Sequence, residues 1–283
     1  MLSSATWPVL SVEQQRSVEA IVENLNIGGA SSLNEVRTLS NRRHYALMLI
    51  THESQKRILK VGEGADFDMI RSEYSSLKRL GYRYSGRVLD YNQTKSAAAI
   101  LLDWVEGRSL VTHWRQVGMK PSVLLTDIER IGKELDYLHA RQVTHGDLQP
   151  THIRFRDSEP TFIDFGVSGP SHEAYSGGLT HYMAPELAAQ CLSGSAPTRS
   201  PEADWYALIA CAYVAITGRA PMQYGANAHR DERLDAISNM RTAFHKGDSH
   251  LAIMLGRALS LRPDERREYV LAISDFWERE KSG

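Results

Sequence analysis

Val143–Gly166, VTHGDLQPTHIRFRDSEPTFIDFG, is the stretch of sequence that decides the fold prediction. Two short apolar runs, Ile153–Phe155 and Thr161–Ile163, lie on either side of the polar sequence DSEP. Apolar runs separated by turn-forming residues predict a β-hairpin. A tight hairpin brings its two flanks together, so we expect the carboxylates of Asp147 and Asp164 to face the same cleft.

Composition places the chain among ordinary globular proteins. Its 283 residues are 42% hydrophobic and 24% charged, enough for one or two lobes with a substantial core. A net charge of -1 argues against nucleic-acid binding, which leaves a basic surface. Cys191 and Cys211 provide neither a disulfide framework nor zinc-ligand spacing, so we expect a reducing, cytoplasmic environment. No signal peptide is predicted, and the apolar run Tyr206–Ile216 is too short to span a membrane.

Apolar periodicity predicts further elements along the chain. An apolar stripe over Ser11–Leu25 predicts a helix, with Ser11 and Gln14 as a capping box. A second helix is predicted after Gly64, and a third over Pro121–Ala140. Three strand-like runs before Gly64 predict an antiparallel meander, and they are Val36–Leu39, His44–Ile50 and Arg57–Val61.

Glu73 is a carboxylate beside the apolar stripe of the second predicted helix. An unpaired carboxylate is costly on a buried face. Glu73 therefore either meets a cation from outside its helix or points to solvent, where Arg71 or Lys78 of the same helix would pair with it.

Two motifs of the opening stretch, in this order and at this spacing, resemble those of protein kinases. His145–His152, HGDLQPTH, is similar to the catalytic loop HRDLKPxN, and Asp164–Gly166 matches the metal-binding motif DFG. The resemblance implies an α+β, two-lobed protein kinase-like fold. Its small antiparallel β-sheet lobe would contain one αC-type helix, and its larger C-lobe would be mainly helical. We expect a helical extension over residues 1–27, the N-lobe over 28–105 and the C-lobe over 106–283.

The resemblance also implies roles for the two aspartates and for residues of the N-lobe. Asp147 would accept the proton of the acceptor hydroxyl, and Asp164 would hold magnesium against the phosphates of ATP. Arg57–Val61 is similar to the VAIK strand, so Lys60 would grip the α- and β-phosphates and pair with Glu73. The strand Ala97–Leu102 would end in the hinge that binds adenine, with these residues in order: Leu102 as gatekeeper, then Asp103, Trp104 and Val105.

Three further matches imply structural roles in the C-lobe. Ala184–Glu186 is the APE motif, and Leu261–Arg266 is similar to the late PxxR element. The resemblance implies a salt bridge between Arg266 and Glu186. Asp204, which would open a buried apolar helix, is expected to accept hydrogen bonds from the backbone of the catalytic loop.

The phosphate-binding loop departs from the family pattern, because the glycine-rich sequence GxGxxGxV is missing. Counting back from Lys60 places the first hairpin turn at Ser40–His44, so Ser40 and Asn41 are the candidate phosphate contacts. An alternative alignment, with a longer hairpin, uses a glycine, a serine and an asparagine, namely Gly29, Ser31 and Asn34.

The catalytic loop departs from the pattern at three positions. His152 replaces the asparagine that binds a second metal, and it could ligate manganese, bind a phosphate or orient the loop. Gly146 replaces the arginine of HRD, which makes control by activation-loop phosphorylation an unexpected mechanism here. Gln149 replaces a catalytic lysine, so one contact to the γ-phosphate would be lost. The HGD sequence also resembles aminoglycoside and choline kinases.

These motifs predict an ATP-dependent phosphotransferase, an atypical kinase without the HRD arginine. It would use ATP with Mg²⁺ or Mn²⁺, and its acceptor would be a serine or threonine of a protein or peptide. A small-molecule hydroxyl kinase of the aminoglycoside type is one alternative. A pseudokinase, an inactive scaffold that binds nucleotide, is the other, and the missing glycines together with His152 and Gln149 favour it.

Overall fold

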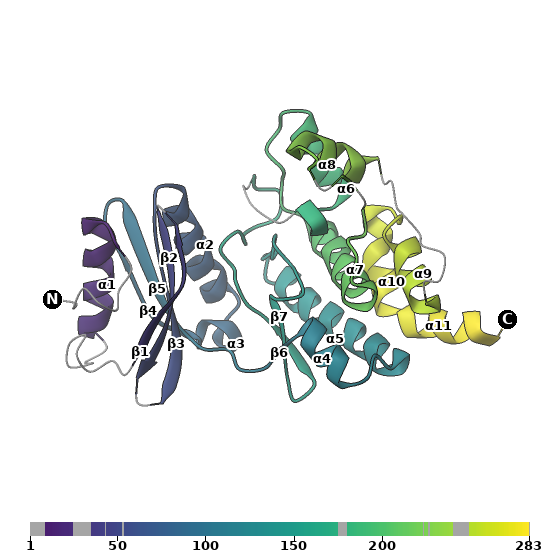
Figure 1. Ribbon diagram of the computed structural model, residues 1–283, viewed down its shortest axis with the longest axis horizontal. Coiled ribbons are helices and arrows are strands. Elements are labelled where there is room, and N and C mark those ends of the chain that lie inside the picture. The colour runs from purple at the N-terminus through teal and green to yellow at the C-terminus, as the bar shows by residue number, and fades with distance from the viewer. Residues whose placement is uncertain are drawn as a thin grey trace. The chain divides into compact units, whose positions relative to one another are not determined.

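The computed structural model describes residues 9–24, 35–42, 44–52, 54–174, 180–222, 224–225, 227–239 and 249–282. The chain divides into two compact units, Met1–Val105 and Glu106–Gly283, whose elements are labelled in Figure 1. Among the described residues, no helix combines the length and the apolar character that crossing a membrane requires.

The first unit is an antiparallel sheet with helices. Its elements are α1 (Val12–Asn24), β1 (Glu35–Arg42), β2 (Tyr45–His52), β3 (Gln55–Glu63), α2 (Ala65–Arg79), α3 (Tyr82–Ser85), β4 (Val88–Gln93) and β5 (Ala97–Asp103). The five strands lie in the order β1-β2-β3-β5-β4, and every neighbouring pair is antiparallel. The predicted meander and the helix that follows it are confirmed, whereas β4 was not predicted from the sequence.

The two main helices of this unit cover opposite faces of the sheet (Figure 1). Apolar residues of α1 form a buried cluster with strand residues that include Leu59, Val61 and Leu101. Because neighbouring side chains of a strand point to opposite faces, Lys60 points away from α1 and toward the side of α2. The predicted capping box of α1 is confirmed, since Ser11 N donates to Gln14 Oε1 at 3.0 Å and Gln14 N donates to Ser11 Oγ at 3.1 Å.

The predicted position of the first hairpin turn is wrong. Ser40 and Asn41 lie inside β1, where they pair with Leu47 and Ala46 of β2. Polar residues are compatible with this position because β1 is an edge strand and one of its faces meets solvent. The turn joins Arg42 to Tyr45 instead. The residues of the alternative alignment, Gly29, Ser31 and Asn34, lie outside the described residues.

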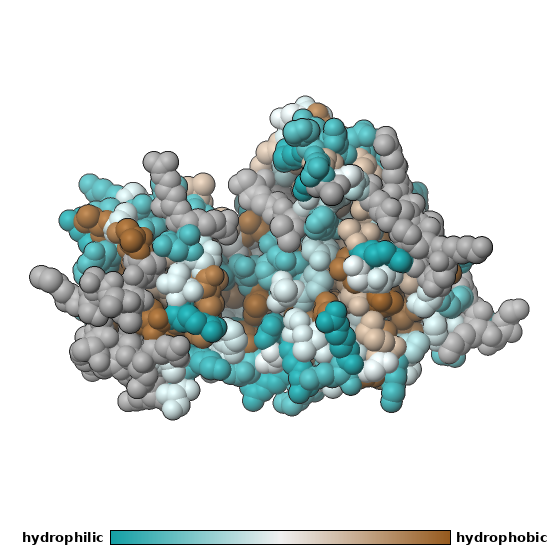
Figure 2. Space-filling model, viewed as in Figure 1, coloured by the Kyte–Doolittle hydropathy of each residue, from teal (hydrophilic) through white to brown (hydrophobic). Residues whose placement is uncertain are grey.

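The second unit is mainly helical and contains a small sheet in the order β6-β7-β8. Its first elements are β6 (Arg108–Ser109), α4 (Leu110–Gln116), α5 (Pro121–His139), β7 (Ile153–Arg156), β8 (Glu159–Phe162) and η2 (Thr180–Tyr182). The remaining elements are α6 (Pro185–Leu192), α7 (Pro201–Thr217), α8 (Arg230–Ser238), α9 (His250–Ala258), η3 (Pro263–Glu265), α10 (Arg266–Leu271) and α11 (Ile273–Ser282). The outer face of α8 is hydrophilic in Figure 2. Together, the sheet unit and the helical unit confirm the predicted α+β, kinase-like architecture.

The buried helix α7 is the centre of this second unit. All eleven residues from Ala203 to Tyr213 are buried. The helix begins at Pro201 rather than at Asp204, because Ser200 caps it and its Oγ accepts from Ala203 N at 3.1 Å. Asp204 therefore lies one turn inside the helix.

The hairpin predicted in the opening stretch is present, with a tighter turn. Asp157 and Ser158 have φ values of 50° and 65°, as in the two-residue turns that match the twist of a hairpin. Arg156 consequently pairs with Glu159, and β8 begins two residues earlier than the sequence suggests. Ile163 follows β8 and leads directly into Asp164.

Candidate active site

Lys60 and Glu73 form a buried ion pair in the first unit. Nζ of Lys60 lies 2.8 Å from Oε1 and 2.7 Å from Oε2 of Glu73, and the two side chains are only 8% and 2% exposed. The predicted pair is thus confirmed, and the solvated position for Glu73 is wrong. Its two alternative partners are engaged elsewhere, since Arg71 pairs with Asp68 and the ammonium of Lys78 lies over the ring of Tyr74.

The predicted hinge follows β5. Leu102 is half-buried, and it lies on the same face of the sheet as Lys60, because Ile100, two residues earlier, pairs with Lys60. Asp103 N donates to Arg87 O at 2.8 Å, and Trp104 N donates to Lys56 O at 3.2 Å. These two N–H groups are used within the unit, so adenine recognition at Asp103 and Trp104 would have to use other atoms.

Asp204 anchors the catalytic loop of the second unit, as predicted. Its Oδ2 accepts from His145 N at 2.8 Å, and its Oδ1 accepts from Gly146 N at 2.9 Å. Nε2 of His139 lies 2.9 Å from Oδ2. Burial alone would raise the pKa of Asp204, but the hydrogen bond and charge of His139, with His145 and the Gly146 N–H, lower it below the ordinary value. A buried carboxylate on α7 thereby fixes the backbone just before Asp147.

His145 joins the catalytic loop to the segment that contains Asp164. Its Nδ1 lies 3.3 Å from Asp147 N, a donor, and its Nε2 lies 3.1 Å from Ile163 O. The imidazole is therefore neutral, with its proton on Nε2. Burial lowers the pKa of His145 to about 4, which agrees with this assignment. His145 is not among the predicted site residues, although its place at the head of HGD is a usable signal.

His152 brings the two aspartates of the opening stretch together. Its Nδ1 lies 2.9 Å from the backbone oxygen of Asp147 and 3.8 Å from Oδ2 of the same residue. Its Nε2 lies 3.4 Å from Oδ2 of Asp164. Both carboxylates thus flank one imidazole, so the hairpin does bring the two aspartates near each other; that they face one cleft stays a prediction. Gln149 adds a contact from the loop, because its Nε2 donates to Oδ2 of Asp147 at 3.3 Å.

Asp164 is the better of the two predicted metal ligands. Its side chain is 41% exposed and its backbone takes a left-handed conformation, with φ of 67°. Among the described residues, no group of three or more His, Cys, Asp or Glu is placed to hold a metal ion. Magnesium is commonly bound by one or two carboxylates together with water and phosphate oxygens, so Asp164 suits it. The nitrogen of His152 is the less suitable ligand for this ion.

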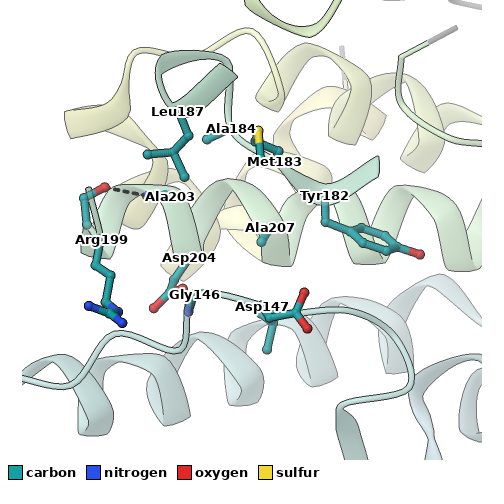
Figure 3. Close-up of a pocket in the computed structure, with 12 residues that line it drawn as sticks. Gly146, Asp147, Tyr182, Met183, Ala184, Leu187, Arg199, Ala203, Asp204 and Ala207 are labelled. Atoms are coloured by element: carbon teal, nitrogen blue, oxygen red, sulfur yellow. Dashed lines mark hydrogen bonds between the residues drawn. The ribbon is translucent and has the colours of Figure 1, made fainter. Parts of the chain in front are cut away.

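A small cavity, with a volume of about 20 Å³, lies beside Asp147 (Figure 3). Gly146, Asp147 and Leu148 of the catalytic loop form one wall. The other lining residues come from the segment that leads into α6, from α6 itself and from the start of α7, and they are Tyr182, Met183, Ala184, Leu187, Arg199, Ser200, Ala203, Asp204 and Ala207. Asp147 therefore lies where the catalytic loop meets the segment before α6 and the start of α7.

The predicted pair of Arg266 and Glu186 is confirmed. The guanidinium contacts Oε1 at 2.5 Å through NH1 and Oε2 at 2.9 Å through NH2. NH1 also donates to Glu202 O at 3.1 Å. This contact ties the start of α6, which follows the cavity, to α10 and to the start of α7.

Comparison with known proteins identifies the family. The model of the protein kinase domain matches residues 20–272, so the chain belongs to the protein kinase domain family. Serine/threonine-protein kinase PknA of Nostoc sp. is 26% identical over 266 residues, which are 87% of this chain and 44% of that protein. Dual specificity protein kinase TTK of Mus musculus is 22% identical, over 81% of this chain and 30% of its own length. CBL-interacting protein kinase 28 of Oryza sativa is 27% identical, over 65% of this chain and 43% of its own length.

The chain spans less than half the length of each of these relatives. The match to the family model begins at residue 20, inside α1, whereas Val18 of this helix already belongs to the buried cluster formed with the strands. Protein kinases as a family use ATP and a divalent metal ion, which is compatible with the exposed carboxylate of Asp164.

Proposed function

We propose that this chain transfers the γ-phosphoryl group of ATP to a serine or threonine hydroxyl of a protein or peptide. The observation that carries the proposal is the group formed by Asp147, His152 and Asp164, which is held in place through Asp204 and His145. Two carboxylates on either side of one imidazole, with Asp147 at the wall of a cavity, favour a chemical role.

Asp147 would orient the acceptor hydroxyl and accept its proton as the new phosphate ester bond forms. The side-chain amide of Gln149 holds one oxygen of this carboxylate, at 3.3 Å, and thus limits its rotation. The backbone around Asp147 is fixed from both sides, by Asp204 before it and by His152 after it. A base held in this way loses little conformational freedom when the acceptor arrives.

Asp164 would hold the divalent ion, and Lys60 would bind the α- and β-phosphates. Magnesium or manganese supplies positive charge that stabilises the phosphates during transfer. The ion pair with Glu73 keeps the ammonium of Lys60 charged and oriented in its buried position. His152 would act as a bridge that fixes the distance between Asp147 and Asp164. The rest of nucleotide binding would come from Leu102 to Val105 and from the end of β1, where Ser40 and Asn41 lie.

A protein acceptor is favoured by the elements that surround the cavity beside Asp147. Tyr182 and Met183 line this cavity, and the Arg266–Glu186 pair secures the helix that follows them. The three similar proteins are named as protein kinases, which supports the same acceptor class. A small-molecule acceptor, suggested by the HGD sequence, is the alternative that the acceptor assay must separate.

A specific observation also supports a pseudokinase as a second candidate. Nε2 of His152 lies 3.4 Å from Asp164, where the family has an asparagine that binds metal. Imidazole nitrogen is a poorer magnesium ligand than the amide oxygen of asparagine, so His152 beside Asp164 disfavours metal binding there. The chain would then bind nucleotide without transferring phosphate.

The test measures binding and transfer in parallel. Thermal shifts with ATP are recorded with no metal, with magnesium and with manganese, for the wild type and Asp164→Asn. Transfer is assayed with serine and threonine peptides and with a panel of small-molecule alcohols, with Asp147→Asn as the inactive control. Phosphorylated peptides that depend on both aspartates support the proposal.

Each other result has a defined meaning. Transfer to small alcohols alone would establish the small-molecule alternative. A nucleotide-dependent shift without transfer under any condition would establish the pseudokinase. The absence of both binding and transfer would overturn the proposed function. A larger shift with manganese than with magnesium would favour His152 as a ligand.

A further inference from the structure

Arg199 is a buried cation that the proposed chemistry does not use. It lies just before α7, and its side chain is 10% exposed. Its Nε donates to Val167 O at 2.8 Å, and its NH1 donates to Ala174 O at 3.4 Å. NH1 also lies 3.8 Å from Oε2 of Glu173. A single guanidinium thus binds both ends of the stretch 167–174, which we call the 167–174 segment.

The backbone secures only one end of this segment to the chain before α7. His172 N donates to Arg199 O at 2.8 Å, and Arg199 N donates to Glu173 O at 3.0 Å. The side chain of Arg199 adds the link to Val167, at the other end. The guanidinium also packs on Gly169, where a Cβ added to the glycine would lie 3.2 Å from the central carbon of the guanidinium. A side chain at position 169 would therefore push the guanidinium away by a few tenths of an ångström.

The segment is in turn bonded to the catalytic loop. Thr144 N donates to Gly169 O at 2.9 Å, and Ser168 Oγ donates to His145 O at 2.8 Å. Val167 is three residues after Asp164. A shift of the segment would therefore move the backbone at Thr144 and His145, just before Asp147, and the backbone just after Asp164. Arg199 acts on the candidate catalytic groups only through this segment, so its role is one of positioning.

Gly146 makes the contact between Arg199 and the 167–174 segment significant. Its φ of 77° favours glycine, and no side chain extends from the loop at this position. Gly146 and Arg199 both line the cavity in Figure 3, where Arg199 is the single cation among the described lining residues. The positive charge that reaches the 167–174 segment here comes from the chain before α7 instead of from the catalytic loop.

We propose that Arg199 is a positioning residue that holds the 167–174 segment, and with it Asp164, in the active arrangement. The proposal rests on the proposed kinase function and adds to it a residue outside the predicted motifs. A guanidinium has several N–H donors in a fixed planar arrangement, so one side chain can bind carbonyl groups at both ends of the segment.

Two substitutions of Arg199 test the proposal. Arg199→Met removes both donors but keeps an apolar chain of similar length, and Arg199→Lys keeps the charge without the two-pronged geometry. We expect Arg199→Met to lower kcat by about 100-fold, with KM for ATP changed by less than about twofold, and Arg199→Lys to retain an intermediate kcat. Arg156→Met is the matched control, because Arg156 is 74% exposed, and its kcat should equal that of the wild type.

Hydrogen exchange separates the positioning role from a general loss of stability. In Arg199→Met the amides of residues 168–172 should exchange faster, while those of α5 and α7 keep their wild-type rates. Faster exchange throughout α5 and α7 in both variants would overturn the proposal, since Arg199 would then be a general stabilising residue. A kcat of Arg199→Met within about twofold of wild type would also overturn it.

Failure of the proposed function and failure of this proposal give different results. If the wild type transfers no phosphate at all, the proposed function fails by that result. The exchange experiment still decides whether Arg199 holds the segment.

Discussion

Each of the two units contains an ion pair with a buried cation, and the two pairs differ in the chemistry of that cation. In the first unit the Lys60 ammonium, on a residue that is 6% exposed, contacts both oxygens of Glu73. In the second unit Arg266 is 1% exposed and contacts both oxygens of Glu186. Judged only by the burial and charge of the cation, the two pairs look alike.

The chemistry of the two cations indicates different roles. The guanidinium of Arg266 also donates to Glu202 O at 3.1 Å, and its centre lies 5.1 Å from the ring centroid of Tyr206. A planar fork bound on several sides is fixed, which suits a residue that connects helices. The ammonium of Lys60 is a compact charge on a flexible stem, and such a group can reorient toward a phosphate. The comparison teaches that the geometry of the cation, more than its burial, separates a structural pair from a functional one.

The largest expected effect is the loss of activity in Lys60→Met. Removing the cation that would bind the phosphates should lower kcat/KM by about 1,000-fold. Lys78→Met, which removes an exposed lysine of α2, is the control and should behave as the wild type. Steady-state kinetics with ATP measure the effect. Full activity in Lys60→Met would mean that Lys60, like Arg266, has a structural role.

The second effect concerns stability. Arg266→Met leaves the partly buried carboxylate of Glu186 without its partner, so the free energy of unfolding should fall by about 3–4 kcal/mol. Urea denaturation measures it. The folded fraction should keep kcat within about threefold of the wild type, because Arg266 holds helices and no reacting group. A fall in kcat as large as that of Lys60→Met would contradict the distinction between the two pairs.

The third effect is a pH dependence located at His145, beside the Asp204 anchor. Burial lowers its pKa from 6.5 to about 4. Between these values the unfolded chain binds a proton that the folded chain does not, so stability falls as pH decreases through this window. The loss should reach about 3 kcal/mol at the acid end. Denaturation at several pH values checks this, and His145→Phe should remove this component. The same slope in His145→Phe would assign it to other groups.

The smallest effect is expected for Arg267, the neighbour of Arg266 in α10. Its guanidinium contacts both oxygens of Asp136 at 2.7 Å, but its side chain is 57% exposed. Solvent screens such a pair, so Arg267→Met should cost only about 0.5 kcal/mol in urea denaturation. A cost equal to that of Arg266→Met would mean that geometry outweighs burial in this helix.

Local patterns predicted most of the elements that position the site. The helix α5 and the capping box of α1 depend on apolar spacing and on neighbouring polar groups, which are properties of short segments. The errors occur where hydrogen-bonded pairing with another segment decides the extent of an element. Ser40 and Asn41 belong to β1 because β2 pairs with them, although their composition is typical of a turn. The early start of α7 follows from Ser200, whose hydroxyl caps the helix.

The sequence by itself determined the class of the chain and the identity of the charged groups. The order of HGD, DFG, APE and PxxR predicts which residues meet, and the pairs Lys60–Glu73 and Arg266–Glu186 are present as predicted. The cost of burying an isolated charge predicts only that each buried charge has a partner of opposite sign, and the resemblance to protein kinases implies which residue that partner is.

Only the tertiary structure decided which neutral and backbone groups complete the site. His145 and His152 bond to backbone carbonyls, and the guanidinium of Arg199 bonds to two more. Every residue has a carbonyl group, so no pattern of side chains marks which one will be the acceptor. Those partners are set by the path of the chain, and the path follows from the packing of α5, α7 and the small sheet.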